Sequence, residues 1–478
     1  MMLFFNIRVL CYLLPWSLLL MACQHKSSRE NPDRVLPGEP PNIIFILADD
    51  MGIGDLGCYG QQRIKTPHID RLAAEGMRFT NFYAGSTVCA PSRASLMTGQ
   101  HTGIVHIRGN GEYPLRQTDT IIPQLLQRHG YTTGMFGKWG LGLQGSTGDP
   151  RHKSWNSFTG HLHHVEAHDQ QPDSLWRIKE GKLLKFAIPE GRYGNEIFTE
   201  DALDFITKQP KDKPFFLYLS FTLPHAELLA PEKYMRPYLD ASGQSIFAPE
   251  TAWAPGQHYG PQPYPKAAYA AMVSSVDSYT GRIMQCLKAK GIDKNTLVIF
   301  ASDNGTHIEG GRSPEDVAFF KSNGPYKGVK RAVYEGGIHE PFIARWPGKI
   351  KPAQRSDHIA AFWDVLPTLT EIAGIPDKPA GINGISFVPE LLGQTEQSQH
   401  EYLYWEFYEQ GGKQAVRKQK WKAVRLNVRK NRNAPLELYD LDTDPGEQYN
   451  IAGEHPEIIR EMEEIMREAH TPNPLFSF

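Results

Sequence analysis

The sequence predicts an α/β protein with a large, mostly parallel sheet sandwiched by helices, followed by a smaller antiparallel subdomain. Short, almost wholly apolar runs alternate with amphipathic helical segments from residue 42 onward, as expected for strands buried on both faces. From near residue 380 the runs are instead closely spaced and flanked by charged residues, as in hairpins. Hydrophobic residues make up 40% of the 478 positions, which is enough for a large core.

The charge balance excludes a broad nucleic-acid-binding surface. The chain has 51 Lys and Arg against 53 Asp and Glu, a formal net charge of -2. A non-specific nucleic-acid binder is expected to be strongly basic instead. We therefore expect no nucleic-acid partner.

The amino-terminal segment predicts export. Arg8 precedes an apolar run from Val9 to Met21, which is shorter than a membrane-spanning helix. The run ends in LMAC, which resembles a bacterial lipobox, so we predict a lipoprotein signal peptide over residues 1–23 and lipidation of Cys23. An ordinary cleavable signal is the alternative. Residues 24–41 are polar and Pro-rich and predict a tether. The expected location is outside the cytoplasm, lipid-anchored at the bacterial outer membrane or periplasmic.

Polar side chains follow four of the predicted strands. The strands are residues 42–47, 131–136, 215–221 and 296–301, and the residues that follow them are Asp49-Asp50, Gly137-Lys138, Pro224-His225 and Asp303-Asn304. Ligands of parallel sheets bind beyond the carboxyl ends of the strands, so these side chains predict a metal or anion site there.

Helices are predicted between these strands. Thr66 and Pro67 provide the cap and first turn of a helix that ends near Gly76, and residues 121–129 predict another. Apolar residues at helical spacing between Tyr269 and Leu287 predict a long amphipathic helix.

The tail predicts a separate small subdomain over residues 381–478, after a catalytic domain over residues 42–380. Its strand candidates are residues 402–405, 415–416, 421–426 and 436–439, and a helix is predicted from Pro456 to His470.

The segment Cys89–Gly99, CAPSRASLMTG, contains the most specific motif. It resembles the C-x-P-S-R signature of the sulfatase family within the alkaline phosphatase superfamily. The resemblance implies an alkaline phosphatase-like fold and a sulfuric ester hydrolase. It also implies that a maturation enzyme oxidises Cys89 to formylglycine (3-oxoalanine). Pro91 suits a first helical turn, which would place residue 89 at a helix N-terminus, where an anionic sulfate ester is favoured.

The same resemblance assigns a metal site. Asp49, Asp50, Asp303 and Asn304, together with the modified Cys89, match the family's ligands for one divalent cation. Oxygen ligands of this kind suit a hard ion, and we expect Ca²⁺ rather than Mg²⁺. Asp303 is also expected to take the proton of the attacking hydroxyl, and Arg93 to hold the formylglycine.

Three further residues match catalytic positions of the family. Lys138 and Lys330 match its two sulfate-binding lysines, and His225 matches the histidine that protonates the leaving alkoxide. Lys330 is preferred to Lys327 because it lies four residues before Tyr334, which is the family spacing.

One position departs from the family pattern. Most sulfatases read GKWHLG where this chain reads GKWGLG, so Gly140 replaces a histidine that contacts formylglycine. The enzyme is then inactive, slower, or supplied with a replacement from another loop. The following stretch is rich in imidazole, and we propose that one of His163, His164 or His168 enters the site as base or substrate ligand; a surface metal cluster or solvated loop is the alternative.

The expected substrate is a sulfated glycan oligosaccharide, from which an exo-acting enzyme would remove sulfate at a terminal sugar. Long loops over residues 146–194 and 247–265 offer aromatic side chains for stacking on sugars: Trp155, Trp176, Trp253, His258, Tyr259 and Tyr264. A formylglycine-dependent phosphoester or phosphonate hydrolase is the second hypothesis, and a glycan-binding lipoprotein that has lost catalysis is the third. Whether Cys58 and Cys286 pair stays open.

Overall fold

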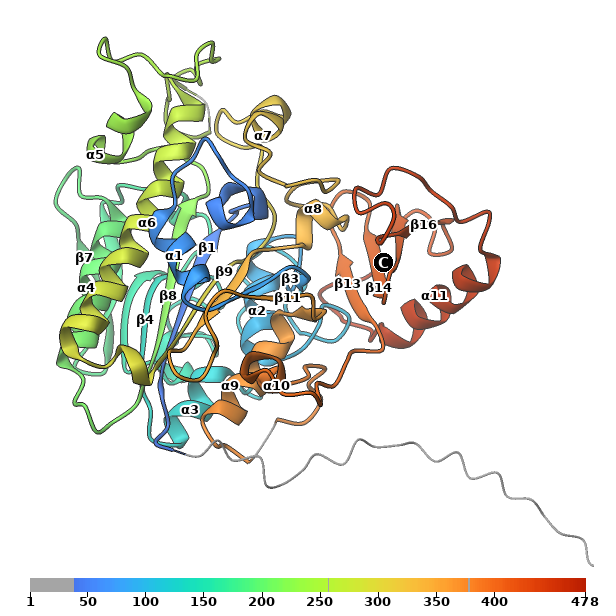
Figure 1. Cartoon of the computed structure of the whole chain (residues 1–478), viewed down its shortest axis with the longest axis horizontal. Coiled ribbons are helices and arrows are strands. Elements are labelled where there is room, and N and C mark those ends of the chain that lie inside the picture. Colours follow the sequence, from blue (N-terminus) through green and yellow to red (C-terminus); the bar gives the residue numbers. More distant parts are fainter. Residues whose placement is uncertain (1–37, 257, 377–378) are drawn as a thin grey trace, which may run out of the picture. The chain divides into compact units, whose positions relative to one another are not determined.

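The structure is a computed structural model that describes residues 38–256, 258–376 and 379–478 (Figure 1). The predicted signal peptide with Cys23, and the predicted tether up to residue 37, lie outside the described residues. Within the described part of the chain, no helix is long and apolar enough to cross a membrane.

The centre of the fold is a ten-stranded sheet in the order β11-β2-β10-β9-β1-β8-β4-β5-β6-β7. Its inner strands β9, β1, β8, β4 and β5 are parallel, and β10, β6 and β7 are antiparallel to their neighbours. The bounds are β1 Asn42–Asp49, β2 Met77–Phe79, β4 Thr132–Lys138, β5 Ser157–His161, β6 Ser174–Lys179, β7 Lys182–Ala187, β8 Phe215–Pro224, β9 Thr296–Ser302, β10 Phe342–Arg345 and β11 Gln354–Ser356. The predicted mostly parallel sheet is confirmed.

Alternate residues of β1 face two different hydrophobic layers. Ile43, Phe45 and Leu47 belong to one cluster, whereas Ile44 and Ile46 belong to the other, and all are buried. A strand buried on both faces has no polar side to show to water, so the run NIIFIL contains almost no polar residue.

Helices cover both faces of the sheet (Figure 1). The layer built around α1, α4 and α6 contains Met272 of α6, and the layer built around α2, α3 and α9 contains Ala94 of α2. The bounds are α1 Pro67–Ala74, α2 Cys89–Thr98, α3 Ile122–Arg128, α4 Gly194–Lys208, α6 Pro265–Lys290 and α9 Val365–Ile372; the shorter helices are α5 Glu232–Met235, α7 Pro314–Phe320, α8 Glu335–Ile338 and α10 Val388–Leu392.

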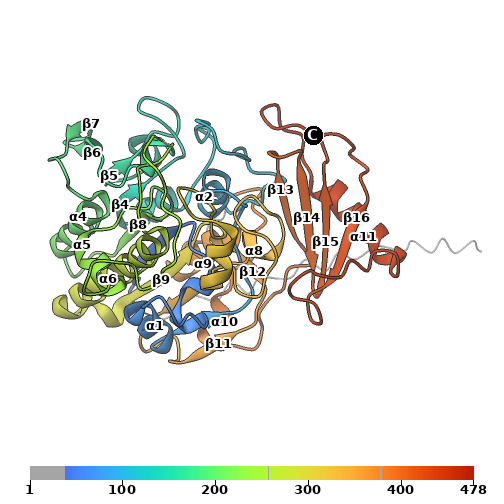
Figure 2. The same cartoon turned by 90° about the horizontal axis from the view of Figure 1, so that it is seen from above.

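A four-stranded antiparallel sheet follows, in the order β13-β14-β15-β16 (Figure 2). The bounds are β13 Leu403–Phe407, β14 Lys413–Lys418, β15 Trp421–Leu426 and β16 Leu436–Asp440. One face packs against Tyr83 and Trp363 of the larger domain, and the other packs against Met462 and Met466 of α11 (Pro456–Ala469). The predicted antiparallel sheet and packing helix are confirmed, while the boundary at residue 380 stays a prediction. A further two-stranded sheet pairs β3 (Phe82–Tyr83) with β12 (Ala360–Ala361).

One prediction about the loops was wrong. Residues 146–194, expected to be a long loop, contain β5, β6 and β7, which extend the large sheet to its edge. In β7 (KLLKFA) only Leu183 is buried. An edge strand of this kind has no continuous apolar run from which to recognise it.

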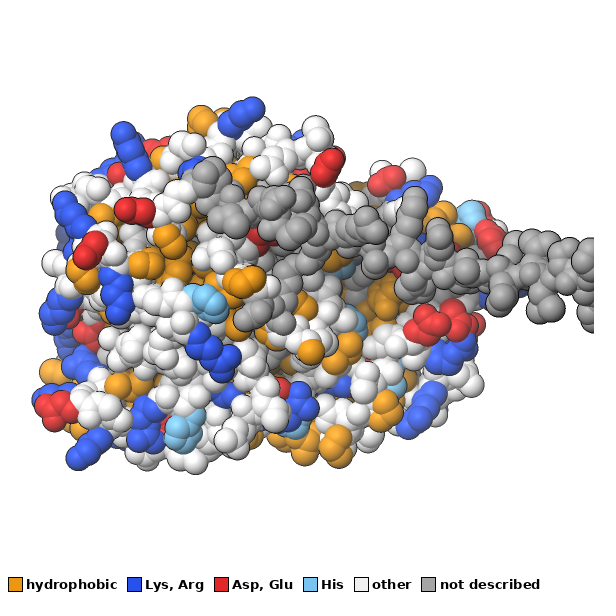
Figure 3. Space-filling view, turned by 90° about the horizontal axis from the view of Figure 1, so that it is seen from below, with side chains coloured by type: hydrophobic (Ala, Val, Ile, Leu, Met, Phe, Trp, Pro, Cys, Tyr) orange, Lys and Arg blue, Asp and Glu red, His pale blue; other side chains and the backbone are white. Residues whose placement is uncertain are grey.

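Charged side chains of both signs are mixed on the face shown in Figure 3, wherever described residues are visible there.

Cys58 and Cys286 are both unpaired. Burial, with help from Asp70, raises the pKa of the Cys58 thiol to about 12, so it is inert at neutral pH.

Candidate active site

The carboxyl ends of four neighbouring parallel strands bring the predicted polar residues together. Asp49 is the last residue of β1 and Lys138 the last of β4, while His225 and Asp303 directly follow β8 and β9. All four side chains are at most 2% exposed. The register sets Ala48 beside Ser302, so the sequence separation of more than 250 residues between Asp49 and Asp303 is bridged by strand pairing alone.

Cys89 faces this edge from the start of α2. Its Sγ lies 3.2 Å from Asp49 Oδ1 and 3.9 Å from Asp50 Oδ1. One potential ligand atom from each of Cys89, Asp49, Asp50 and Asp303 lies within 4.8 Å of all the others. The N-terminal end of α2, which is the positive end of its helix dipole, thus lies beside a cluster of carboxylates.

The carboxylates differ in proton affinity because their partners differ. Burial raises the pKa of Asp50 to about 7, although Lys330 lowers it. Burial and the neighbouring Asp49 also raise the pKa of Asp303. Burial acts in the same direction on Asp49, but Lys138 and Arg93 outweigh it and hold its pKa well below the usual range. Three buried carboxyl groups in one cluster suit occupation by a divalent cation.

Asn304 tests the fit of such a cation. Its Nδ2 donates to Asp50 Oδ1 at 2.6 Å, while its Oδ1 is buried without a hydrogen-bond partner among the described residues. A half-turn of the carboxamide exchanges the two atoms and would direct the oxygen at the cluster. Three carboxylates and an amide oxygen form a hard-oxygen donor set, so the residues fit a cation such as Ca²⁺.

Three cations hold the carboxylates in place. Lys138 Nζ lies 2.6 Å from Asp49 Oδ2, and Lys330 Nζ lies 2.7 Å from Asp50 Oδ2. Arg93 donates to Asp303 Oδ2 from Nε at 3.0 Å and from a terminal nitrogen at 2.8 Å. Arg93 is only 1% exposed, so it is a buried partner of the carboxylate cluster and not a surface residue of α2.

His225 lies against Lys330. Its Nε2 is 2.7 Å from Lys330 Nζ and 3.3 Å from Asp50 Oδ2, and its Nδ1 is 2.5 Å from the carbonyl oxygen of Ala226. Burial and the positive charge of Lys330 lower the pKa of His225 well below its usual value. The ring is therefore neutral, and Nε2 is directed at the lysine and the carboxylate cluster.

The imidazole-rich stretch leaves β5 at the same edge. β5 is parallel to β4, with Lys138 opposite His161, and the N–H of Gly140 donates to the carbonyl of Leu162. A Cβ added to Gly140 would meet only His164 Cβ, at 3.9 Å, within 4 Å. The segment that follows β5 thus lies beside the position that lacks the family's histidine.

The three candidate histidines differ in their contacts. His163 Nε2 and His164 Nδ1 lie 3.1 and 2.6 Å from the same oxygen of Glu112. His168 instead stacks on His225, with ring centroids 4.2 Å apart and planes 18° from parallel. Its Nδ1 is buried without a partner among the described residues. Of the three, His168 is the one in direct contact with a predicted catalytic residue.

Sequence reasoning missed two residues at this site. Glu309 Oε2 lies 3.3 Å from His225 Nε2 and 3.5 Å from Lys330 Nζ, and Glu309 also pairs with Arg331. Arg331 could have been recognised as a site residue because it directly follows Lys330 in the sequence. Glu309 had no such signal, since it follows Asp303 by six residues in a segment without regular structure.

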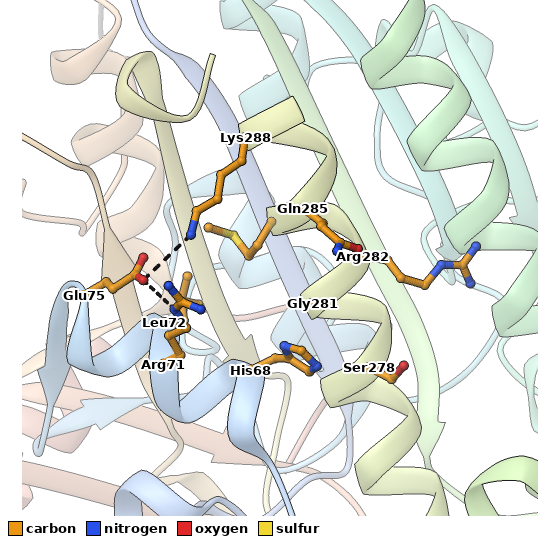
Figure 4. A pocket seen from close by; sticks show the side chains of 10 residues that line it. His68, Arg71, Leu72, Glu75, Ser278, Gly281, Arg282, Gln285 and Lys288 are labelled. Atoms are coloured by element: carbon orange, nitrogen blue, oxygen red, sulfur yellow. Dashed lines mark hydrogen bonds and ion pairs between the residues drawn. The ribbon is translucent and has the colours of Figure 1, made fainter. Parts of the chain in front are cut away.

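A separate surface pocket of about 380 Å³ lies between α1 and α6 (Figure 4). Its charged residues are largely paired with one another: Glu75 binds Arg71 at 2.6 Å and Lys288 at 3.9 Å. None of the predicted site residues lines it. The candidate site at the strand ends is therefore separate from this pocket.

Comparison with known families identifies two regions. Residues 41–375 match the family described as Sulfatase, and residues 327–471 match the family described as N-sulphoglucosamine sulphohydrolase, C-terminal.

Individual relatives agree with these matches. The chain is 29% identical to an N-acetylgalactosamine-6-O-sulfatase of Bacteroides thetaiotaomicron, covering 98% of this chain and 99% of that protein. It is 31% identical to human arylsulfatase A, over 89% of this chain and 87% of the human protein. Among solved structures, Ps i-CgsB is similar with a TM-score of 0.76 and 26% identity, over 90% of this chain and 93% of the other.

Proposed function

The chain belongs to the sulfatase family and is a sulfuric ester hydrolase, and we propose that it removes sulfate from glycans through a formylglycine at position 89 and one divalent cation. The observation that supports this most strongly is the position of Cys89. It begins α2 and lies 3.2 Å from Asp49, among carboxylates whose charge is balanced by three buried cations.

The proposed chemistry starts from hydrated formylglycine, a geminal diol. One hydroxyl attacks sulfur, giving its proton to Asp303, and the bond from sulfur to the sugar oxygen breaks. The second hydroxyl then loses its proton, the aldehyde re-forms, and the C–O bond to sulfate breaks. A serine at this position would be left as a stable sulfate ester, because it has no second hydroxyl to drive release.

Lys138 and Lys330 bind the sulfate oxygens in this proposal. Both ammonium groups are buried and already paired with Asp49 and Asp50, so each is held at a fixed position before substrate arrives. His225 is the proposed donor of a proton to the departing sugar oxygen. In the substrate-free site its neutral ring accepts from Lys330 at Nε2, so this nitrogen must first be protonated, which the negative charge of a bound sulfate ester favours.

Asp49, Asp50, Asp303, Asn304 and the modified residue 89 would hold the cation. When bound, Ca²⁺ would polarise the sulfate oxygens and lower the pKa of the attacking hydroxyl. Arg93 keeps the Asp303 carboxylate oriented through two nitrogen contacts to one oxygen.

The names of the relatives support a sugar substrate. Several are N-acetylgalactosamine-6-sulfatases, from bacterium to human, and Ps i-CgsB has been solved with a bound neocarrahexaose. We propose a sulfated galactose or hexosamine at the end of a glycan. Turnover of matched sulfate and phosphate esters separates this from the phosphoester alternative: faster hydrolysis of the phosphate ester would contradict it.

His168 is the proposed replacement for the histidine absent at Gly140. It stacks on His225, and burial with the positive charges of Lys138 and Lys330 lowers its pKa to about 3, so it is a neutral acceptor. Changing His168 to Ala should slow steady-state turnover at least tenfold, whereas the His163→Ala and His164→Ala variants should stay within threefold. Equal effects of all three changes would contradict this assignment.

Mass analysis of the Cys89 peptide tests the proposal first. Conversion of cysteine to formylglycine lowers the peptide mass, and it requires a maturation enzyme as partner. An unconverted thiol in protein from the native host would rule out the formylglycine mechanism and favour a glycan-binding role. We also propose export and lipid anchoring at Cys23; a Cys23→Ser variant found in the membrane fraction in the same amount as wild type would contradict it.

A further inference from the structure

The proposed reacting groups are shielded from water. The side chains of Lys330, His225 and Asp50 are 3%, 1% and 0% exposed. A sulfate bound among them is buried, yet the sugar that bears it must extend out of the protein. The side chains between these groups and water therefore decide which sugar is accepted.

Glu309 and Arg331 occupy that position. Glu309 contacts both His225 and Lys330, at 3.3 and 3.5 Å, and is itself 19% exposed. Arg331 forms an ion pair with Glu309 and is 33% exposed. The hydroxyl of Tyr259 donates to Glu309 Oε2 at 3.4 Å, so three segments without regular structure meet at this point.

The backbone at Arg331 is unusual for a residue with a side chain. Its φ of 72° is in the left-handed region, where glycine is favoured and other residues carry strain of about 1 kcal/mol or more. Lys330 and Arg331 are adjacent in sequence, but the first is buried against Asp50 and the second reaches solvent. The left-handed conformation is compatible with two adjacent side chains that extend in different directions. Because glycine would adopt this conformation with less strain, we infer that the Arg331 side chain has a function that offsets the strain.

Both members of the pair are charged, and each also contacts one further group of opposite charge, Lys330 for Glu309 and Glu409 for Arg331. Although burial acts against ionisation, Lys330, His307 and Arg331 hold the pKa of Glu309 at about 2, so its carboxylate is ionised at neutral pH. Arg331 has one further acidic neighbour, Glu409 at 3.6 Å, which is 41% exposed. A carboxylate that accepts and a guanidinium that donates, side by side, suit two neighbouring hydroxyl groups of a sugar.

We propose that Glu309, Arg331 and Tyr259 form the subsite that binds the hydroxyl groups of the leaving sugar next to its sulfated position. The inference rests on the proposed function and adds the residues that select the sugar. A simple aryl sulfate has no such hydroxyl groups, so its hydrolysis does not draw on this subsite.

The test compares two substrates on the same variants. Wild type, Glu309→Gln and Arg331→Gly are assayed with 4-nitrophenyl sulfate and with a panel of galactose and N-acetylhexosamine sulfates. Arg331→Gly removes the side chain while glycine keeps the left-handed backbone. A hydrogen bond to a charged group implies that the sugar-to-aryl ratio of kcat/KM falls about 10- to 100-fold in each variant.

Gln419→Gly is the matched control, because Gln419 also has a positive φ, 54°, but lies in the turn between β14 and β15. It should leave the ratio unchanged. An unaltered ratio in both site variants would overturn the inference, because the pair would then act only through Lys330 and His225. Wild type that hydrolyses the aryl ester but no sugar sulfate would overturn it too. Wild type inert to both, with Cys89 converted, would instead refute the proposed function.

Discussion

Replacing Arg93 with Met gives the sharpest test of how this site is held together. Arg93 is 1% exposed and donates to three groups: Asp303 through two nitrogens, the carbonyl of Lys138 at 2.9 Å, and the hydroxyl of Ser220. Methionine has a similar reach but no hydrogen to donate. The buried Asp303 carboxyl group would be left without its ion-pair partner.

The expected loss of unfolding free energy is about 3–5 kcal/mol, the usual cost of removing one partner of a buried ion pair. Repulsion among Asp49, Asp50 and Asp303 would add to this in the absence of a cation. Because Ca²⁺ would supply a replacement positive charge, the loss should be larger in EDTA than with Ca²⁺. The measurement is urea unfolding of wild type and Arg93→Met under both conditions.

Arg345→Met is the matched control. Arg345 is 4% exposed and pairs with Glu75 and Asp293, but these carboxylates are 30% and 23% exposed and keep contact with water. Its loss should therefore be about 1 kcal/mol and insensitive to Ca²⁺. Equal losses in the two variants, or a loss below about 1 kcal/mol for Arg93→Met, would refute the reasoning.

Three further outcomes are expected. Chelation with EDTA should lower Tm and abolish turnover, and Ca²⁺ should restore both; full activity after exhaustive chelation would contradict the proposed metal site. Gly137→Ala should prevent folding, because a Cβ there would lie 1.8 Å from the carbonyl oxygen of Ser220. The control Gly181→Ala, where a Cβ would meet nothing within 4 Å, should lower the unfolding free energy by about 1 kcal/mol. Thermal unfolding of the soluble protein measures both effects. His101 is buried and accepts a hydrogen bond from the N–H of Gly103 at its Nδ1; burial, with Arg108, lowers its pKa to about 3. The unfolded chain binds this proton below about pH 6.5 and the native protein does not, so stability should fall as pH drops from 6.5 toward 3, and less steeply in His101→Gln; parallel pH curves would contradict this.

Much of the fold and of the site could be predicted from local patterns. Strand β1 is buried on both faces, so its sequence is an almost continuous apolar run. Asp49 and Asp50 interrupt that run where the strand ends. Cys89 is recognisable from the residues beside it in the chain. The edge strand β7 and its neighbour β6 were missed for the converse reason, since half-exposed strands leave a weak pattern.

Glu309 illustrates what no local pattern contains. It is paired with Arg331, which is 22 residues away in the chain, and it contacts His225 from a segment without regular structure. His168 likewise stacks on His225 because β5 is parallel to β4, so the segment that follows β5 begins at the same edge of the sheet as the candidate site.

The sequence by itself therefore identified most of the candidate site residues, because each of them has a recognisable motif beside it in the chain. Only the tertiary structure decided which of them meet and what surrounds them. Parallel strands gather residues hundreds of positions apart at one edge, and such contacts depend on strand order and register, which are set by the packing of the whole core.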